Sequence, residues 1–158
     1  MRILIVGGNG TIGKKVSAHF SKKHEVIVAG RSSGDVNVDI ADAKSIASLF
    51  LGIGKIDAIV CIAGEAKWAT FDSMTEDDFY IGLKSKLMGQ VNLVRIGQDY
   101  LETGGSFTLT TGMLADYPVV MTTSAAMVNG GIHSFVKAAA LELKNEHRIN
   151  VVSSGLVE

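Results

Sequence analysis

Three glycines near the start of the chain have the spacing of a phosphate-binding loop. Gly7, Gly10 and Gly13 fall in the stretch IVGGNGTIGKKV, between an apolar run and an amphipathic one. The first glycine permits a tight turn off a strand, the second lets backbone amides approach a diphosphate, and the third lets a helix pack closely on the strand. The positive end of that helix would face the phosphates. The expected contacts are Gly7, Asn9, Gly10, Thr11, Ile12 and Gly13. A glycine-rich turn without a ligand is the alternative.

The residues after the second apolar run bear on which dinucleotide is bound. Sites that prefer NAD usually end this strand in Asp or Glu, which bonds the ribose hydroxyls. Here the run VIVAG is followed by Arg31, Ser32 and Ser33, and Asp35 comes late in the turn. Arg31 is placed to stack on adenine or to pair with a 2′-phosphate, and the serines can donate to the same phosphate. The pattern favours NADP over NAD, with a solvated turn arginine as the alternative.

Alternating elements position these residues. Short Val/Ile-rich runs predict strands at 2–6, 25–29, 36–40, 56–63, 106–111 and 149–153, and amphipathic runs predict helices at 11–23, 42–52, 75–101 and 122–146. This alternation predicts an α/β fold, a Rossmann-type doubly wound parallel sheet with α/β/α layers. With one proline and no linker, we expect residues 1–158 to form a single domain, and a lid or last strand beyond Glu158 would fit.

Composition narrows the class of function. The chain has 158 residues, is 47% hydrophobic, and carries a net charge of −1 without a basic block. These values argue against nucleic acid or anionic membranes as partners. No apolar run approaches the roughly 20 residues of a membrane span, and the lone Cys61 favours a reduced, cytoplasmic setting. The scattered His19, His24, His133 and His147 predict no metal site. We take His133 as an exposed helix residue; the alternative is that it reaches the edge of the cleft, because it lies four residues after Asn129 on the same helix.

Several segments together resemble the short-chain dehydrogenase/reductase family along essentially the whole chain. GGNGTIG resembles the family's phosphate loop, and NVDI resembles the segment whose acid contacts adenine, which implies that role for Asp39. CIAG is similar to the family's Asn-Asn-Ala-Gly, matching at Ala63 and Gly64, and INVVSSGLVE resembles the segment beside the nicotinamide. The resemblance implies an oxidoreductase that binds a nicotinamide cofactor and acts on a small carbonyl or alcohol substrate.

The family's four catalytic side chains are all replaced. In the family a Lys lies thirteen residues before the Glu of an A-L-E segment; here that Glu is Glu142, which puts Asn129 at the Lys position and Ala125 at the Tyr position. Alignment of GSFTLTTG puts Gly112 at the Ser position, and Lys86 falls at the Asn position. Lys86 and Thr111 are the weak catalytic candidates that remain. A Tyr-x-x-x-Lys from Tyr80 to Lys84 lies on the earlier helix, and we take it as chance spacing.

The resemblance leaves two functions open. One is a short-chain dehydrogenase/reductase-like, NADP(H)-binding oxidoreductase of undetermined substrate; the other is a non-enzymatic NADP(H)-binding sensor or scaffold subunit. In the family the two long helices, here 75–101 and 122–146, pack against a symmetry mate, which implies a homodimer or homotetramer. A face that includes Ala138, Ala139 and Ala140 agrees with this, although these alanines can equally pack on the sheet. Trp68, on the loop after the fourth strand, either lines a substrate site or caps the core.

Overall fold

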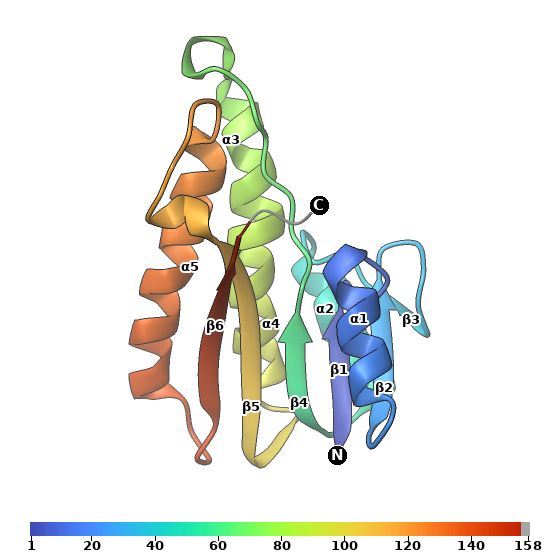
Figure 1. The fold of residues 1–158 in the computed structure, drawn as a ribbon. Helices are drawn as coiled ribbons and strands as arrows, with labels where there is room; N and C mark the ends of the chain where they lie inside the picture. The colour runs from blue at the N-terminus through green and yellow to red at the C-terminus, as the bar shows by residue number, and fades with distance from the viewer. Residues whose placement is uncertain (156–158) are drawn as a thin grey trace.

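A parallel sheet runs through the centre of the molecule (Figure 1). The computed structural model describes residues 1–155. The strands are β1 (Arg2–Val6), β2 (Glu25–Gly30), β3 (Val36–Asn37), β4 (Ile56–Cys61), β5 (Leu101–Gly112) and β6 (Arg148–Ser154). They are hydrogen-bonded in the order β3-β2-β1-β4-β5-β6, each pair parallel. This is the predicted doubly wound sheet. Its order reverses between β1 and β4, where ligands of such sheets bind at the strands' carboxyl ends.

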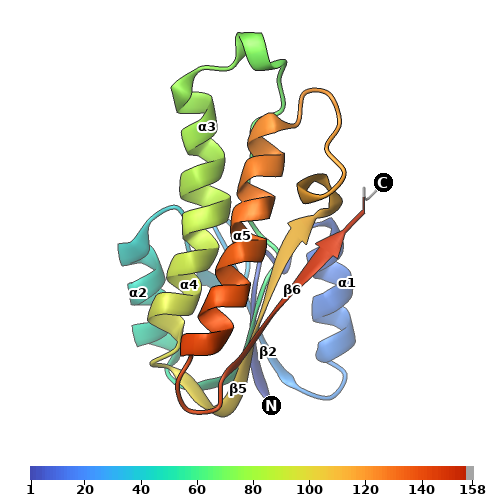
Figure 2. The same ribbon diagram turned by 90° about the vertical axis from the view of Figure 1, so that its left-hand side faces the viewer.

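Helices on both faces of the sheet bury its apolar side chains. α2 (Ala43–Ile53), α4 (Gly89–Gly97) and α5 (Thr123–Glu142) lie on one face, and α1 (Thr11–Phe20) lies on the other (Figure 2). The larger core is on the first face, where Phe50, Leu93 and Ile132 are fully buried. On the opposite face, Val16 and Phe20 of α1 pack against buried residues of β1 and β4. The predicted three-layer arrangement is therefore present.

The helix predicted over 75–101 is a composite. It consists of α3 (Glu76–Gly82), a π-helical segment (Leu83–Met88) and α4, which ends at Gly97. Its start agrees with the prediction, because the side chains of Thr75 and Asp78 each accept a hydrogen bond from the other residue's amide. Its predicted end is wrong, since Leu101 already pairs with Ile56 as the first residue of β5.

Other element ends also differ from the prediction. β5 is longer than 106–111, and a register shift between Ile56 and Ala58 lets the strand begin early. α5 stops at Glu142 rather than 146, because Leu143 already has an extended ψ of 135°, and Asn145 and Glu146 then adopt positive φ angles of 56° and 59°. α1 ends at Phe20 rather than 23, and β3 is limited to Val36–Asn37.

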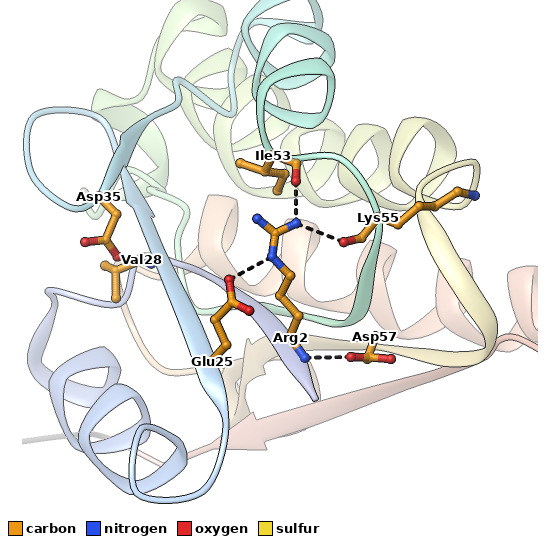
Figure 3. Close-up of polar contacts among 7 residues, drawn as sticks. All are labelled: Arg2, Glu25, Val28, Asp35, Ile53, Lys55 and Asp57. Carbon is orange, nitrogen blue, oxygen red and sulfur yellow. Dashed lines mark hydrogen bonds and ion pairs between the residues drawn. The ribbon is translucent and has the colours of Figure 1, made fainter.

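Arg2 fixes the amino-terminal edge of the sheet (Figure 3). Its backbone amide donates to Asp57 Oδ2 at 2.6 Å, and its Nε lies 2.8 Å from Glu25 Oε1. Its Nη1 donates to the carbonyl oxygens of Ile53 and, at 3.0 Å, Lys55. One side chain thus joins the starts of β1 and β2 to the turn between α2 and β4. The opposite edge of the sheet carries the clefts described next.

Candidate functional site

A cleft of about 410 Å³, the first cleft, opens at the carboxyl ends of β1, β2 and β4, where the strand order reverses. It is lined by most of the residues that the sequence singled out. These are Gly7, Asn9, Gly10, Arg31, Asp39, Ala63 and Gly64. Thr11, Ile12 and Gly13 form the first turn of α1, and Ser33 rather than Ser32 reaches the lining. Ser85, from the π-helical segment, also lines the first cleft and had no signal in the sequence.

The glycine loop has the geometry that its spacing predicts. Gly7 has a φ of +84°, which side-chain-bearing residues rarely adopt. A Cβ on Gly13 would lie 2.1 Å from the Gly7 carbonyl oxygen, so only glycine lets α1 pack this closely on the loop. Within residues 1–155 no side chain caps the N-terminus of α1, whose N-cap residue is Gly10. The first amides of α1 therefore remain available to an anionic group at its positive end.

Polar side chains at the end of β2 shape the rim of the first cleft. Arg31 Nη2 lies 2.8 Å from Glu65 Oε1, and both side chains are largely exposed. Asp35 is turned inward, where its Oδ2 accepts from the Val28 amide at 2.8 Å. That carboxylate is therefore already bonded to the backbone of β2 and is not free to accept from a ribose hydroxyl. This agrees with the expectation that Asp35 comes too late in the turn for that role. Of these charged side chains, Arg31 is the one that can pair with a phosphate group.

A second cleft, of about 500 Å³, continues from the first through Gly64 and Glu65, which line both. It lies between the end of β5, the loop after β4, the π-helical segment and the start of α5. The residues at the four positions counted in the sequence all line it: Lys86, Gly112, Ala125 and Asn129. Elements far apart in the chain thus bring these residues to one site.

Lys86 enters the second cleft from the π-helical segment, a feature that often marks functional sites. Burial lowers the pKa of its ammonium group, and the nearby Cys61 acts in the opposite sense. Burial also raises the pKa of the Cys61 thiol to about 11. A Cβ on Gly64 would lie 2.8 Å from Cγ of Lys86, so a glycine at 64 is needed for the lysine stem to take this path.

Asn129 borders the second cleft from α5 and is only 2% exposed. Its Oδ1 is buried without a hydrogen-bond partner among residues 1–155. Gly112 lies beside this amide, and a Cβ at that position would lie 3.3 Å from Asn129 Nδ2. An unpaired buried amide of this kind is costly unless a ligand or water satisfies it.

Thr111 and His133 form a pair that the sequence did not predict. Thr111 Oγ1 lies 2.7 Å from His133 Nε2, and Thr111 lines the second cleft. The expectation that His133 is an exposed helix residue is wrong, since it is half-buried against β5. It lies one helical turn after Asn129, and this spacing was the only signal that it faces the sheet.

The rest of the second cleft is mainly apolar. Trp68 and Met113 line it, with exposed fractions of 49% and 39%, so that Trp68 lies at the cleft rather than capping the core.

No group of three or more His, Cys, Asp or Glu side chains within residues 1–155 is placed to hold a metal. Over the same residues, no helix is both long and apolar enough to cross a membrane.

A parallel sheet of this order, with a glycine loop at its switch point, defines a Rossmann-type nucleotide-binding domain. The protein family described as enoyl-(acyl carrier protein) reductase matches residues 12–158. The chain belongs to the short-chain dehydrogenase/reductase family, whose members are oxidoreductases that use nicotinamide cofactors. No curated protein matches it.

Solved structures support the assignment. The protein lin1944 from Listeria innocua is 46% identical, with a TM-score of 0.98 over 100% of this chain and 79% of that chain. A small-chain dehydrogenase in complex with NADPH is 32% identical, with a TM-score of 0.92 over 100% of this chain and 71% of that one. A short-chain dehydrogenase/reductase from Vibrio parahaemolyticus, 15% identical with a TM-score of 0.86 over 98% of this chain and 84% of that chain, shares the fold.

Proposed function

We propose that the chain binds NADP(H) in the first cleft and is an oxidoreductase that acts on a small carbonyl or alcohol substrate in the second. The observation that carries this proposal is the continuity of the two clefts through Gly64 and Glu65. A dinucleotide that fills the first cleft would extend its reactive end toward the second. The NADPH complex of the 32% identical dehydrogenase supports the cofactor assignment.

The residues present fit a dinucleotide. The side-chain-free surface at Gly7 and Gly10 and the uncapped start of α1 suit a diphosphate. Asp39 lines the same cleft and would contact the adenine end. Arg31 favours NADP over NAD, because a 2′-phosphate can replace Glu65 as its anionic partner and no free carboxylate from β2 competes for the ribose.

The second cleft has few groups for proton transfer. Bound NADPH supplies a hydride; the chain must orient the substrate and provide a proton to its oxygen. Ala125 has no proton to give, whereas the Thr111 hydroxyl bonds the half-buried His133. In this proposal His133 exchanges protons with solvent and replaces the one that Thr111 gives to the substrate oxygen. Lys86 and Asn129 hold the substrate.

A second candidate function is a non-enzymatic NADP(H)-binding sensor or scaffold subunit. Gly112 and Ala125 favour it, because neither can hydrogen-bond or protonate a substrate through a side chain. It predicts tight NADPH binding without carbonyl reduction.

Calorimetric titration with NADPH and NADH tests the cofactor assignment. We expect NADPH to bind more tightly than NADH, and Arg31→Ala to reduce the affinity for NADPH roughly tenfold or more while changing that for NADH little. Lys23→Ala, an exposed cation beyond the far end of α1, is the matched control. An unchanged NADPH preference in Arg31→Ala would remove Arg31 from the 2′-phosphate site. A panel of carbonyl substrates with NADPH then separates the enzyme from the sensor.

Two further proposals concern the oligomeric state and the cellular location of the protein. We propose a homodimer or homotetramer formed through α4 and α5, and a cytoplasmic location that accords with the single buried thiol.

A further inference from the structure

The second cleft contains a positive charge without a counter-charge. Among residues 1–155 the side-chain ion pairs are Arg2 with Glu25 and Arg31 with Glu65, so the Lys86 ammonium has no acidic partner. Within residues 1–155, Glu65 is the one carboxylate that lines this cleft, and it lies 2.8 Å from Arg31. Half-burying a cation without a partner is costly, and an anionic ligand would repay that cost.

Asn129 provides an independent indication of a polar ligand. Its side chain is buried, borders the same cleft, and leaves Oδ1 without a partner within residues 1–155. Gly112 has no side chain and lies beside the amide, since a Cβ at that position would lie 3.3 Å from Asn129 Nδ2. The amide Nδ2 can donate to a carbonyl or carboxylate oxygen of a ligand, and its Oδ1 can accept from a ligand hydroxyl group. The cation and the amide thus offer two polar contacts in one cleft.

The apolar side chains of the second cleft indicate what the rest of the ligand is made of. Trp68, Met113 and Leu114 line the second cleft and supply an aromatic ring, a thioether and an aliphatic chain. Aromatic rings pack well against tryptophan and methionine side chains. A ligand with a charged end and an apolar or aromatic body matches both walls.

We propose that the second cleft binds an organic carboxylate with an apolar, aromatic-sized body, its carboxylate paired with Lys86 and its other polar group with Asn129. The inference rests on the proposed function, which makes this carboxylate the substrate class. The carbonyl compound reduced there would be an oxo acid. NADPH, when bound, would supply the hydride to the carbonyl carbon and become NADP⁺. The Thr111 hydroxyl would give a proton to the substrate oxygen and regain one from His133, and the hydroxy acid would leave.

The chain contains a built-in reporter for this binding. Trp68 is the only tryptophan in the sequence and lies in the second cleft. Its fluorescence can follow titration with 3-phenylpropionate and with its neutral counterpart of the same shape, 3-phenylpropanamide. Neither probe has a ketone to reduce, so the readout is binding alone. Each titration is run with and without saturating NADP⁺, and NADPH affinity is measured separately.

We expect the acid to bind roughly ten- to hundredfold more tightly than the amide. Lys86→Met should remove this preference and leave NADPH affinity unchanged. Lys84→Met is the matched control, because Lys84 is exposed over the Tyr80 ring outside the second cleft, and it should keep the preference. Asn129→Asp places a second negative charge in the cleft and should weaken binding of the acid alone, which keeps the test decisive if Lys86→Met does not fold.

Equal affinities for acid and amide, or no binding of either probe, would overturn the proposal. So would competition between NADP⁺ and the acid, or a loss of NADPH affinity in Lys86→Met with the acid preference intact, since Lys86 would then belong to the cofactor's phosphates. If NADPH fails to bind while the acid preference persists, the proposed cofactor function fails and the carboxylate site stands.

Discussion

At the scale of single residues, the proposed carbonyl reduction depends on the Thr111–His133 pair, because Gly112 and Ala125 have no side chain that could donate a proton. The 2.7 Å contact of the pair joins a cleft-lining hydroxyl to a half-buried imidazole. If the chain reduces carbonyl compounds, His133→Phe should lower kcat about a hundredfold, because proton transfer commonly contributes this much. NADPH affinity should stay within twofold of the unmodified protein. His19→Phe, on α1 away from both clefts, is the control, and equal rates in both variants would exclude the relay.

Cys61 is a buried thiol whose state depends on folding. Burial raises its pKa to about 11 from an ordinary 9.0, so the folded protein binds this proton more tightly than the unfolded chain. The thiol's contribution to stability is therefore complete below pH 9 and is lost as pH rises toward about 11, at most roughly 3 kcal/mol. Urea unfolding of the native protein and of Cys61→Ala should show their stability difference shrinking over this range. A difference independent of pH would contradict the shift.

Residue counting singled out four residues that line the second cleft, but not every contact made there. Lys86, Gly112, Ala125 and Asn129 were placed by alignment to motifs, and the folded chain brings them to one cleft. The partner of Thr111 was not found, because a histidine on a helix has no sequence signal for the strand opposite it. The Arg31–Glu65 pair was missed for the same reason: its residues are 34 positions apart.

At the scale of elements, the π-helical segment packs closely against the loop after β4 at Gly64. That glycine has a φ of +132°, and an added Cβ would lie 2.8–2.9 Å from Lys86 atoms. Gly64→Ala should lower the free energy of unfolding by about 2 kcal/mol or more, because strain and steric overlap add. Gly130→Ala, in α5 with nothing within 4 Å of its Cβ position, should instead raise it by about 0.5–1 kcal/mol. Chemical denaturation measures both, and equal effects would refute the fit.

Element types followed from the sequence, whereas several element ends did not. The strands near 2–6, 25–29 and 149–153 were predicted because short Val/Ile-rich runs are typical of strands in parallel sheets. The helix over 75–101 was predicted too long, since Leu101 pairs with Ile56 only through a register shift that no local pattern encodes. Nor does the sequence mark Leu83–Met88 as π-helical, because the apolar periodicity of a helix does not change at a single wider turn.

At the scale of the whole molecule, α4 and α5 present a groove of about 480 Å³ beside Ala138 and Ala139. Val91, Val94 and Phe135 give it an apolar floor, and its rim carries both signs of charge, on Arg95, Asp99, Glu142 and Lys144. A patch that is apolar at its centre and mixed in charge at its rim can be complementary to its own copy about a two-fold axis. This favours the proposed homodimer or homotetramer, with α4 and α5 of each copy in the interface.

Ala138→Arg tests this assembly, because a long charged side chain in the groove would separate two copies without disturbing the sheet. Light scattering after size-exclusion chromatography should show a dimer or tetramer for the unmodified chain and a monomer for the variant. Ala18→Arg, exposed on α1 at the other face, should leave the assembly intact. Because the clefts are lined by residues of one chain, the monomeric variant should still bind NADPH with unchanged affinity. An oligomer that survives Ala138→Arg would place the interface elsewhere on the molecule.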